Sequence, residues 1–244
     1  MKKGVLACIS LACSLILSSG VASADNKQIS KALIDVDVGK TATSQQYREI
    51  SAEACYANAK GSLLYIRSFY SSGNLKATGS GFVISADGLA VTAAHVVSDG
   101  KSITATTADG KELAAEIVSC DAATDIAIIR LPKGTYKTLT LAVSPPEGGA
   151  VVRAMGYPIK DTFIITEGIT AAPSATVNDK QRMLVTCDIV NGMSGGPVFD
   201  RFGNIVGMVS GSVRTMDGIH LSALSSELFA AVRAGLGNSK EGTK

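Results

Sequence analysis

A long succession of short β-rich runs, separated by turn residues, constrains the fold of this 244-residue chain more than any other feature. From residue 61 onward, the first set of runs covers residues 62–70, 79–85, 89–97, 102–108, 112–120 and 125–131. No helical pattern of ten or more residues lies between these runs, which disfavours βαβ units. Short strands at this spacing favour an antiparallel sheet closed into a barrel, so we predict a first barrel at about residues 61–132.

A second set of β-rich runs follows a turn-rich joint at residues 132–149. Its runs cover residues 150–157, 161–173, 182–190, 195–200, 203–213 and 218–223, and they predict a second barrel at about residues 148–222. The last segment places Leu224, Leu228, Ala231 and Val232 at helical spacing, which predicts a helix at about residues 224–236. The predicted fold class is all-β, with two barrels and a closing helix. Periodicity alone leaves a single β-sandwich as the alternative.

The first 24 residues have the pattern of a signal peptide. Lys2 and Lys3 precede a short apolar run, and residues 22–24, Ala-Ser-Ala, are the small residues that signal peptidase requires. We therefore expect an exported protein, periplasmic or secreted, whose mature chain starts at Asp25 and has no membrane span. A retained membrane anchor is the alternative interpretation of the apolar run.

Residues 25–60 are polar and weakly patterned, which predicts an N-terminal arm followed by a short helix. Tyr47, Ile50, Ala54 and Ala57 would share one face of that helix. The remaining chain, residues 61–244, would form one domain that contains both barrels and the C-terminal helix.

The charge balance limits the classes of partner, and the cysteine content limits the number of disulfides. The 23 basic residues include Lys2 and Lys3 of the leader, so the mature chain would carry 21 basic and 21 acidic residues. Such a balance gives no electrostatic reason to expect nucleic acid or an anionic membrane as partner. Three cysteines lie beyond the leader, Cys55, Cys120 and Cys187, and they allow at most one internal disulfide, whose pairing the sequence leaves open.

Ser194 lies in the glycine-rich stretch 191–200, "NGMSGGPVFD". The core "GMSGG" formally matches the nucleophile elbow of α/β-hydrolases, and an exported esterase of that type is one hypothesis. However, an elbow serine is followed by a helix and further parallel strands, whereas Pro197 starts a strand-like run and only 50 residues remain. A structural turn is the other interpretation of a serine among glycines.

Two upstream residues change the interpretation of Ser194. His95 is one of two histidines and follows a strand-like run at the start of a possible helical turn. Asp125 lies at the head of an almost wholly apolar run, where an unpaired carboxylate would be costly to bury. Taken singly, a core histidine and a solvated strand cap would be ordinary. Together with Ser194, they form the set of groups that acyl transfer requires.

Each of these groups has a chemical role in acyl transfer. A serine hydroxyl is a weak nucleophile, so the His95 imidazole would accept the proton of Ser194 and return it to the leaving amine. The Asp125 carboxylate would fix the imidazole tautomer and stabilise the imidazolium. The backbone N–H groups of Gly192 and Ser194 would form the oxyanion hole.

Several motifs, in order, resemble the trypsin-like serine proteases of the chymotrypsin fold, and among these the bacterial HtrA-type (DegP-like) enzymes. They are "GSGFVISADGLAVTAAHVV", "TDIAIIRL", "AMGYP", "TEGITAAP" and "GMSGGPVFDRFGNIVGM", within residues 61–236. The resemblance implies two six-stranded antiparallel barrels, with His95 and Asp125 from the first and Ser194 from the second. It also implies that the Ser210 hydroxyl supports the triad aspartate.

The chain departs from that family in two respects. HtrA-type proteases normally carry PDZ domains after the protease, and the roughly 20 residues beyond the second barrel leave no room for one. Met193 stands where trypsin-type zymogens have an aspartate that pairs with a freed N-terminus, so activation through that ion pair is not expected.

The resemblance also indicates a possible substrate pocket formed by Asp188, Ser212 and His220. Asp188 could line the pocket or lie in solvent, and we favour the solvated position. A histidine near the place of His220 receives acidic side chains in glutamate-specific relatives. With one histidine available, we expect a medium-sized apolar preference and keep Glu/Asp preference as the alternative.

We therefore predict an exported serine endopeptidase that cleaves polypeptides through an acyl-enzyme and uses no cofactor. With two histidines and no cysteine pair at ligand spacing, the chain offers no zinc ligand set. The rival from another class is a catalytically weak or inert binding protein that retains a protease fold. The sequence does not fix the oligomeric state.

Overall fold

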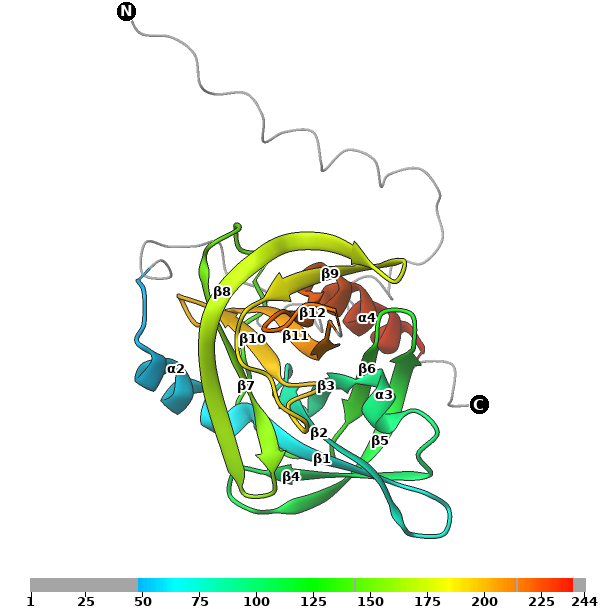
Figure 1. The fold of residues 1–244 in the computed structure, drawn as a ribbon. Coiled ribbons are helices and arrows are strands. Elements are labelled where there is room, and N and C mark those ends of the chain that lie inside the picture. The colour runs from blue at the N-terminus through cyan, green and yellow to red at the C-terminus, as the bar shows by residue number, and fades with distance from the viewer. Residues whose placement is uncertain (1–47, 143, 214, 239–244) are drawn as a thin grey trace, which may run out of the picture.

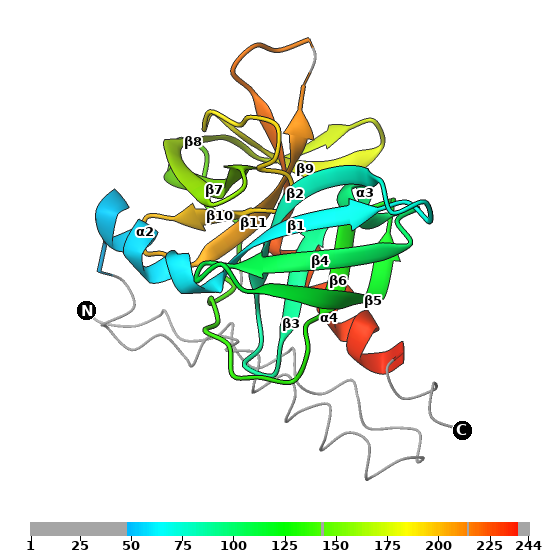
Figure 2. The same cartoon turned by 90° about the horizontal axis from the view of Figure 1, so that it is seen from below.

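Two closed antiparallel β-barrels, seen in Figures 1 and 2, make up most of the protein in a computed structural model that describes residues 48–142, 144–213 and 215–238. The predicted fold class is confirmed. The leader, residues 1–24, and most of the predicted arm lie outside the described residues. In the described part of the chain, no helix is long and apolar enough to cross a membrane.

The first barrel has the strand order β1-β2-β3-β6-β5-β4. Its elements are η1 (Lys60–Ser62), β1 (Leu63–Phe69), β2 (Leu75–Val83), β3 (Leu89–Ala93), α3 (Ala94–Val97), β4 (Ser102–Thr107), β5 (Glu112–Asp121) and β6 (Ile126–Arg130). Every residue of β3 is buried, and so is most of β6. Both faces of these strands are covered because they lie between the barrel interior and elements packed outside, which explains their continuous apolar sequences.

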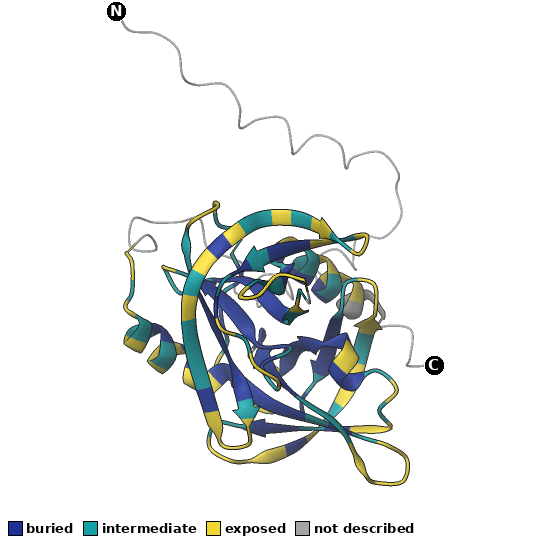
Figure 3. Cartoon of the chain, viewed as in Figure 1, coloured by how far each residue is buried: buried dark blue, intermediate teal, exposed yellow. Residues whose placement is uncertain are grey.

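The second barrel has the strand order β10-β11-β12-β9-β8-β7. Its strands are β7 (Val151–Ile159), β8 (Thr162–Val177), β9 (Lys180–Val185), β10 (Pro197–Asp200), β11 (Ile205–Ser212) and β12 (His220–Leu224). The long β8 curves around the outside of this barrel in Figure 1, and Figure 3 shows it mostly exposed or half-buried while the barrel interiors are dark blue. Closure of both barrels pairs strands that would otherwise be open sheet edges.

The C-terminal helix α4 (Ser225–Asn238) starts directly after the second barrel but packs against β5 and β6 of the first (Figure 2). Leu228 and Val232 are buried in a core cluster to which both barrels contribute, as their helical spacing predicted. Leu224, which was predicted to share that helix face, instead ends β12, because the chain stays paired in the sheet until the helix starts at Ser225. The joint between the barrels is also packed, because Leu139 and Leu141 are buried and Leu141 forms a β-bridge with Ile205. The two barrels therefore form one packed unit.

The short N-terminal helix differs from its prediction in register. Helix α2 spans Ala52–Ala59, and the Ser51 hydroxyl caps it by accepting a hydrogen bond from the Ala54 amide at 3.2 Å. Ile50 therefore lies before the helix, Ala57 is exposed, and the buried face is formed by Cys55 and Ala59. The predicted face was wrong because the serine cap, rather than the apolar spacing, fixes where the helix begins. Tyr47 lies outside the described residues.

The three cysteines beyond the leader are all free thiols in the structure. Cys55 and Cys187 are buried, in α2 and beside the second barrel core, and burial raises the pKa of each thiol to about 11. Cys120 is exposed on β5. The disulfide that the sequence allowed is therefore not formed.

Candidate active site

His95 projects from the four-residue helix α3, which follows β3 without a connecting loop. Ala94, Val96 and Val97 are buried and anchor this turn, whereas the His95 side chain is 50% exposed. Anchoring by three apolar neighbours lets a single polar residue face outward in a fixed direction. The imidazole is thereby held at the surface of the first barrel.

Asp125 precedes β6, and its carboxylate accepts several hydrogen bonds while being only 13% exposed. The His95 ring Nδ1 lies 2.9 Å from Oδ1 and 3.0 Å from Oδ2, and the His95 backbone N–H donates to Oδ1 at 3.0 Å. Burial acts to raise the pKa of the Asp125 carboxyl, but the hydrogen bonds from His95 and Ser210 outweigh it and hold the pKa below its ordinary value. The carboxylate is therefore ionised at neutral pH.

Ser210 reaches Asp125 from the other barrel. It lies in β11, and its hydroxyl donates a hydrogen bond to Asp125 Oδ2 at 2.6 Å. A carboxylate oxygen that accepts such a charge-assisted bond is strongly oriented. The structure thus brings together three of the predicted site residues, His95, Asp125 and Ser210.

Ser194 lies in the loop between β9 and β10, and this loop is attached to both barrels. Gly195 N–H donates to Val209 C=O at 2.8 Å within the second barrel, and Ser80 N–H of β2 donates to Ser194 C=O at 2.8 Å from the first. Gly79 contacts both sides of the junction, since a Cβ there would lie 3.0 Å from the Ser194 oxygen and 2.7 Å from a Val96 methyl of α3. The serine loop and the histidine helix are therefore neighbours.

In the described part of the chain, the imidazole of His95 hydrogen-bonds to Asp125 and not to the Ser194 hydroxyl. A hollow of about 350 Å³ borders His95 and Asp125. Its lining comes from both barrels and includes Ser98, Lys180, Arg182 and Leu221. Ser194 does not line this hollow, which therefore lies on the Asp125 side of the imidazole.

Ser80 is a residue of the site that the sequence did not single out. Its buried hydroxyl donates to Gly192 C=O at 2.7 Å and accepts from Tyr157 N–H at 2.7 Å. These bonds orient the peptide group that follows Gly192, whose φ of 94° is left-handed. The available signal was a serine between two glycines in "GSGF", but its partners are 77 and 112 residues away in sequence.

Met193, next to Ser194, is fully buried in the core of the second barrel. It packs with Val152, Val185 and Val198 among others. A thioether in an apolar core forms no ion pair, and its packing fixes the backbone beside Ser194.

Of the three residues predicted to form the substrate pocket, two form a hydrogen bond with each other and the third, Asp188, bonds to neither. Ser212 and His220 lie opposite each other on β11 and β12, with Ser212 Oγ 2.9 Å from His220 Nδ1. Asp188 is exposed in the β9–β10 connection, and its carboxylate makes no hydrogen bond or ion pair within the described residues. The described residues also contain no group of three or more His, Cys, Asp or Glu side chains that could hold a metal ion.

Gly195 should tolerate no side chain. Its φ is 87°, and a Cβ would lie 2.2 Å from Ser80 C=O and 2.7 Å from Ala93 N. We expect Gly195→Ala to lower the free energy of unfolding by about 3 kcal/mol or more, because strain and a backbone clash add. Gly73→Ala is the matched control, since Gly73 has φ of 82° and nothing within 4 Å of the added carbon. Urea unfolding that gives both variants the same stability would contradict the close packing of this loop.

Comparison with known proteins identifies the family. The model of the trypsin-like peptidase domain matches residues 79–208, which include His95, Asp125 and Ser194. The chain belongs to the trypsin-like peptidase family. The resemblance predicted from the motifs is therefore confirmed.

Other trypsin-like peptidases with similar sequences are described as probable periplasmic serine endoproteases, DegP-like. The protein from Halomonas elongata is 37% identical over 139 residues, which is 55% of this chain and 29% of that protein. The one from Brucella suis is 35% identical over 138 residues, or 54% of this chain and 27% of that protein. The chain thus spans less than a third of the length of these relatives.

The fold has a solved counterpart in the serine endoprotease from Yersinia pestis. The two structures superpose with a TM-score of 0.69 at 22% sequence identity, over 79% of this chain and 69% of the other. This likeness supports the chymotrypsin-like arrangement of the two barrels.

Proposed function

We propose that this trypsin-like peptidase is a serine endopeptidase that cleaves polypeptides through an acyl-enzyme, with Ser194 as nucleophile, His95 as general base and Asp125 as its orienting carboxylate. The observation that carries the proposal is the position of the Asp125 carboxylate between His95 Nδ1 at 2.9 Å and Ser210 Oγ at 2.6 Å. Asp125 thus joins a histidine of the first barrel to a serine of the second, beside the serine loop.

The hydrogen bonds of Asp125 assign the tautomer of His95. An ionised carboxylate can only accept, so the Nδ1 atom facing it carries the proton. The Nε2 atom is then an acceptor and can serve as the base. The hydrogen bond between Nε2 and the Ser194 hydroxyl would form when substrate binds, as catalytic hydrogen bonds often do.

In the first half of the reaction, Ser194 Oγ attacks the scissile carbonyl carbon while His95 Nε2 takes the hydroxyl proton. Collapse of the tetrahedral intermediate breaks the C–N bond, and the imidazolium gives that proton to the leaving amine. Water then attacks the acyl-enzyme with the same base, which releases the new carboxyl end and restores Ser194. No cofactor takes part in these steps.

The negative oxygen of each tetrahedral intermediate would be stabilised by the backbone N–H groups of Gly192 and Ser194. The Ser80 hydroxyl supports this role, because it holds Gly192 C=O at 2.7 Å and so fixes the turn from which the donors project. Donors fixed before the reaction need no reorganisation as charge develops.

Export is part of the proposal. The signal-like leader at residues 1–24 supports it, as do relatives described as periplasmic. Polypeptides of the cell envelope or its surroundings would then be the substrates.

Substrate preference at the residue before the cleaved bond should be for a medium-sized apolar side chain. His220 already shares a 2.9 Å hydrogen bond with Ser212, so its Nδ1 is engaged. We expect His220→Ala to leave the apolar preference unchanged in a peptide-library cleavage profile. Loss of a Glu or Asp preference in that variant would instead establish the acidic pocket.

The function is tested by treating the purified mature chain with a fluorophosphonate. The Oγ atom of an activated serine displaces fluoride and forms a phosphonate ester, and mass spectrometry of the digested protein should locate that ester on Ser194. The rate of casein cleavage should fall in proportion to the fraction of protein that carries the label. If the native protein takes up no label and cleaves neither casein nor a peptide library, it is a binding protein with a protease fold.

A further inference from the structure

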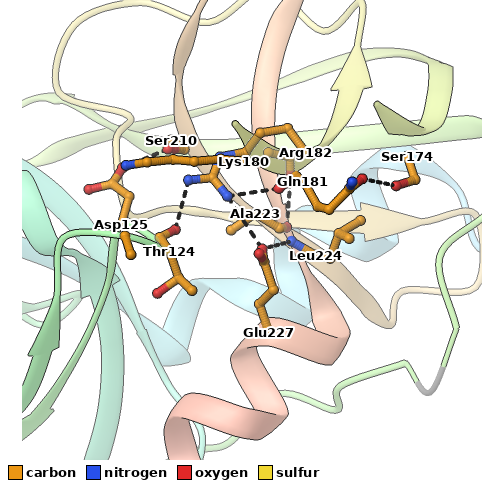
Figure 4. Close-up of polar contacts among 12 residues, drawn as sticks. Thr124, Asp125, Ser174, Lys180, Gln181, Arg182, Ser210, Ala223, Leu224 and Glu227 are labelled. Atoms are coloured by element: carbon orange, nitrogen blue, oxygen red, sulfur yellow. Dashed lines mark hydrogen bonds and ion pairs between the residues drawn. The ribbon is translucent and has the colours of Figure 1, made fainter. Parts of the chain in front are cut away.

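Arg182 is a buried arginine of the second barrel that reaches the turn leading to Asp125. It lies on β9, and its side chain is only 3% exposed. Figure 4 shows the guanidinium between the Thr124 carbonyl and the Glu227 carboxylate of α4. A buried guanidinium with fixed partners holds them in a definite geometry, because its donors form a rigid planar fork.

Three oxygen acceptors lie around the Arg182 guanidinium. Nη2 donates to Thr124 C=O at 3.0 Å, and Nη1 donates to Gln181 C=O at 2.8 Å. Nη1 also lies 3.5 Å from Glu227 Oε2, which in turn accepts the Leu224 N–H at 3.0 Å. The side chain thus links the second barrel, helix α4 and the first barrel within one network.

The Thr124 carbonyl matters because Asp125 has an unusual backbone conformation. Its φ is 63°, in the left-handed region, which costs a non-glycine residue on the order of 1 kcal/mol or more. The angle is set by the two peptide groups that flank Asp125. Ala94 N–H holds the following one through Asp125 C=O at 3.0 Å, and Arg182 holds the preceding one through Thr124 C=O.

The same turn has one more contact with β9. Lys180 Nζ donates to Ala122 C=O at 2.7 Å, while Asp121 accepts from Ala123 N–H and from the Thr124 hydroxyl. Lys180 and Asp121 hold the turn itself. Among the described residues, only Arg182 donates a hydrogen bond to the carbonyl that directly precedes Asp125.

We propose that Arg182 is a positioning residue for the triad, which fixes the peptide before Asp125 and thereby keeps the carboxylate on His95 Nδ1. The proposal rests on the proposed function. The second barrel would then orient Asp125 twice, through Ser210 at the carboxylate and through Arg182 at the backbone. Displacement of a catalytic group by about 1 Å can lower a rate by up to about 100-fold.

The test compares variants that separate the Thr124 contact from the Glu227 contact. Arg182→Met removes both contacts. The double variant Arg182→Met with Glu227→Gln also removes the half-buried carboxylate that would be left without its partner, which protects folding. Glu227→Gln alone keeps the Arg182–Thr124 bond and an acceptor for Leu224 N–H. Arg153→Met is the matched control, because Arg153 is also buried and bonds a carboxylate, Glu167, and a carbonyl, Ile50.

The measurements are kcat and KM per fluorophosphonate-titrated site, at a temperature where every variant is folded. Both Arg182 variants should lose about 10- to 100-fold in kcat with KM within about twofold. Glu227→Gln and Arg153→Met should keep kcat within about twofold. The positioning role is wrong if the double variant retains the wild-type kcat, or if Arg153→Met loses as much.

A second readout does not depend on activity. The proton on His95 Nδ1, held by the carboxylate, should be visible by NMR in the wild type and in Glu227→Gln, and should exchange rapidly in both Arg182 variants. An unlabelled, inactive wild type would refute the proposed function alone. A persistent Nδ1 proton in the Arg182 variants would refute the positioning role.

Discussion

Ser194→Ala is expected to lower kcat for peptide cleavage by on the order of 10⁶-fold, because in the proposed mechanism the Ser194 hydroxyl forms the acyl-enzyme. Binding should persist, so KM or the inhibition constant of a substrate-like peptide should change little. The serine is only half-buried and its replacement adds no atom, so the midpoint of thermal unfolding should stay close to that of the wild type. Single-turnover assays with a fluorogenic peptide would measure the loss.

The control for this variant is Ser174→Ala, which changes an exposed serine on β8 that bonds Gln181 at 2.8 Å. It should retain wild-type kcat and fluorophosphonate labelling. Activity of Ser194→Ala above about 1% of wild type, in protein free of contaminating protease, would rule out Ser194 as the nucleophile.

Asp125→Asn is expected to lower kcat by about 10⁴-fold at neutral pH. An asparagine that turns its NH₂ group toward His95 Nδ1 would force the proton onto Nε2, and Nε2 could then no longer accept the Ser194 proton. With the NH₂ group in the place of Oδ2, the amide oxygen still accepts the His95 backbone N–H and the Ser210 hydroxyl accepts from the NH₂ group, so the local packing should survive. Steady-state kinetics on folded protein would measure the change, and a loss of less than about tenfold would refute the role of Asp125.

The same variant has a predictable dependence of stability on pH. The pKa of Asp125 is lowered from its ordinary value in the folded protein, because the effect of burial is outweighed by hydrogen bonds from His95 and Ser210. A carboxyl with a lowered folded pKa contributes stability above its unfolded pKa and loses it as pH falls through the folded pKa. The stability advantage of wild type over Asp125→Asn should therefore be constant near neutral pH and shrink below about pH 4, as urea unfolding would show.

Asp87→Asn is the matched control for the kcat measurement. Asp87 also accepts hydrogen bonds from a serine, Ser85, and from a basic side chain, Arg130, but it lies in the β2–β3 turn. Its replacement should leave kcat unchanged. An equal fall in kcat for both aspartate variants would mean that the loss reflects general damage to the first barrel.

Much of the fold could be predicted from local sequence. The order and approximate limits of the strands follow from alternating and continuous apolar runs, because each strand buries side chains that are neighbours along the chain. The helix face of Leu228 and Val232 was predicted for the same reason. The limits of α2 were not, because a single hydrogen bond from Ser51 decided where the helix begins.

The candidate site also contains residues that the sequence indicated and residues that it did not. His95, Asp125 and Ser194 could be proposed from the sequence because each has a chemical identity that is unusual where it stands: a histidine after a buried strand, a carboxylate before one, and a serine among glycines. Ser80 and Arg182 have no such local mark. Their partners, Gly192 and Thr124, are brought to them only when the barrels close and pack against each other.

The sequence by itself therefore determined which strands form, in what order, and which chemical groups this trypsin-like peptidase has available. The tertiary structure alone decided that the cysteines stay free, that Met193 is a core residue, and that the second barrel reaches Asp125 through both Ser210 and Arg182. The physical reason is the separation along the sequence between the residues that interact. Apolar periodicity depends on residues that are close together in the sequence. The features that only the tertiary structure decided depend on groups that are far apart in the sequence, and the packing of the two closed barrels sets the distances between those groups.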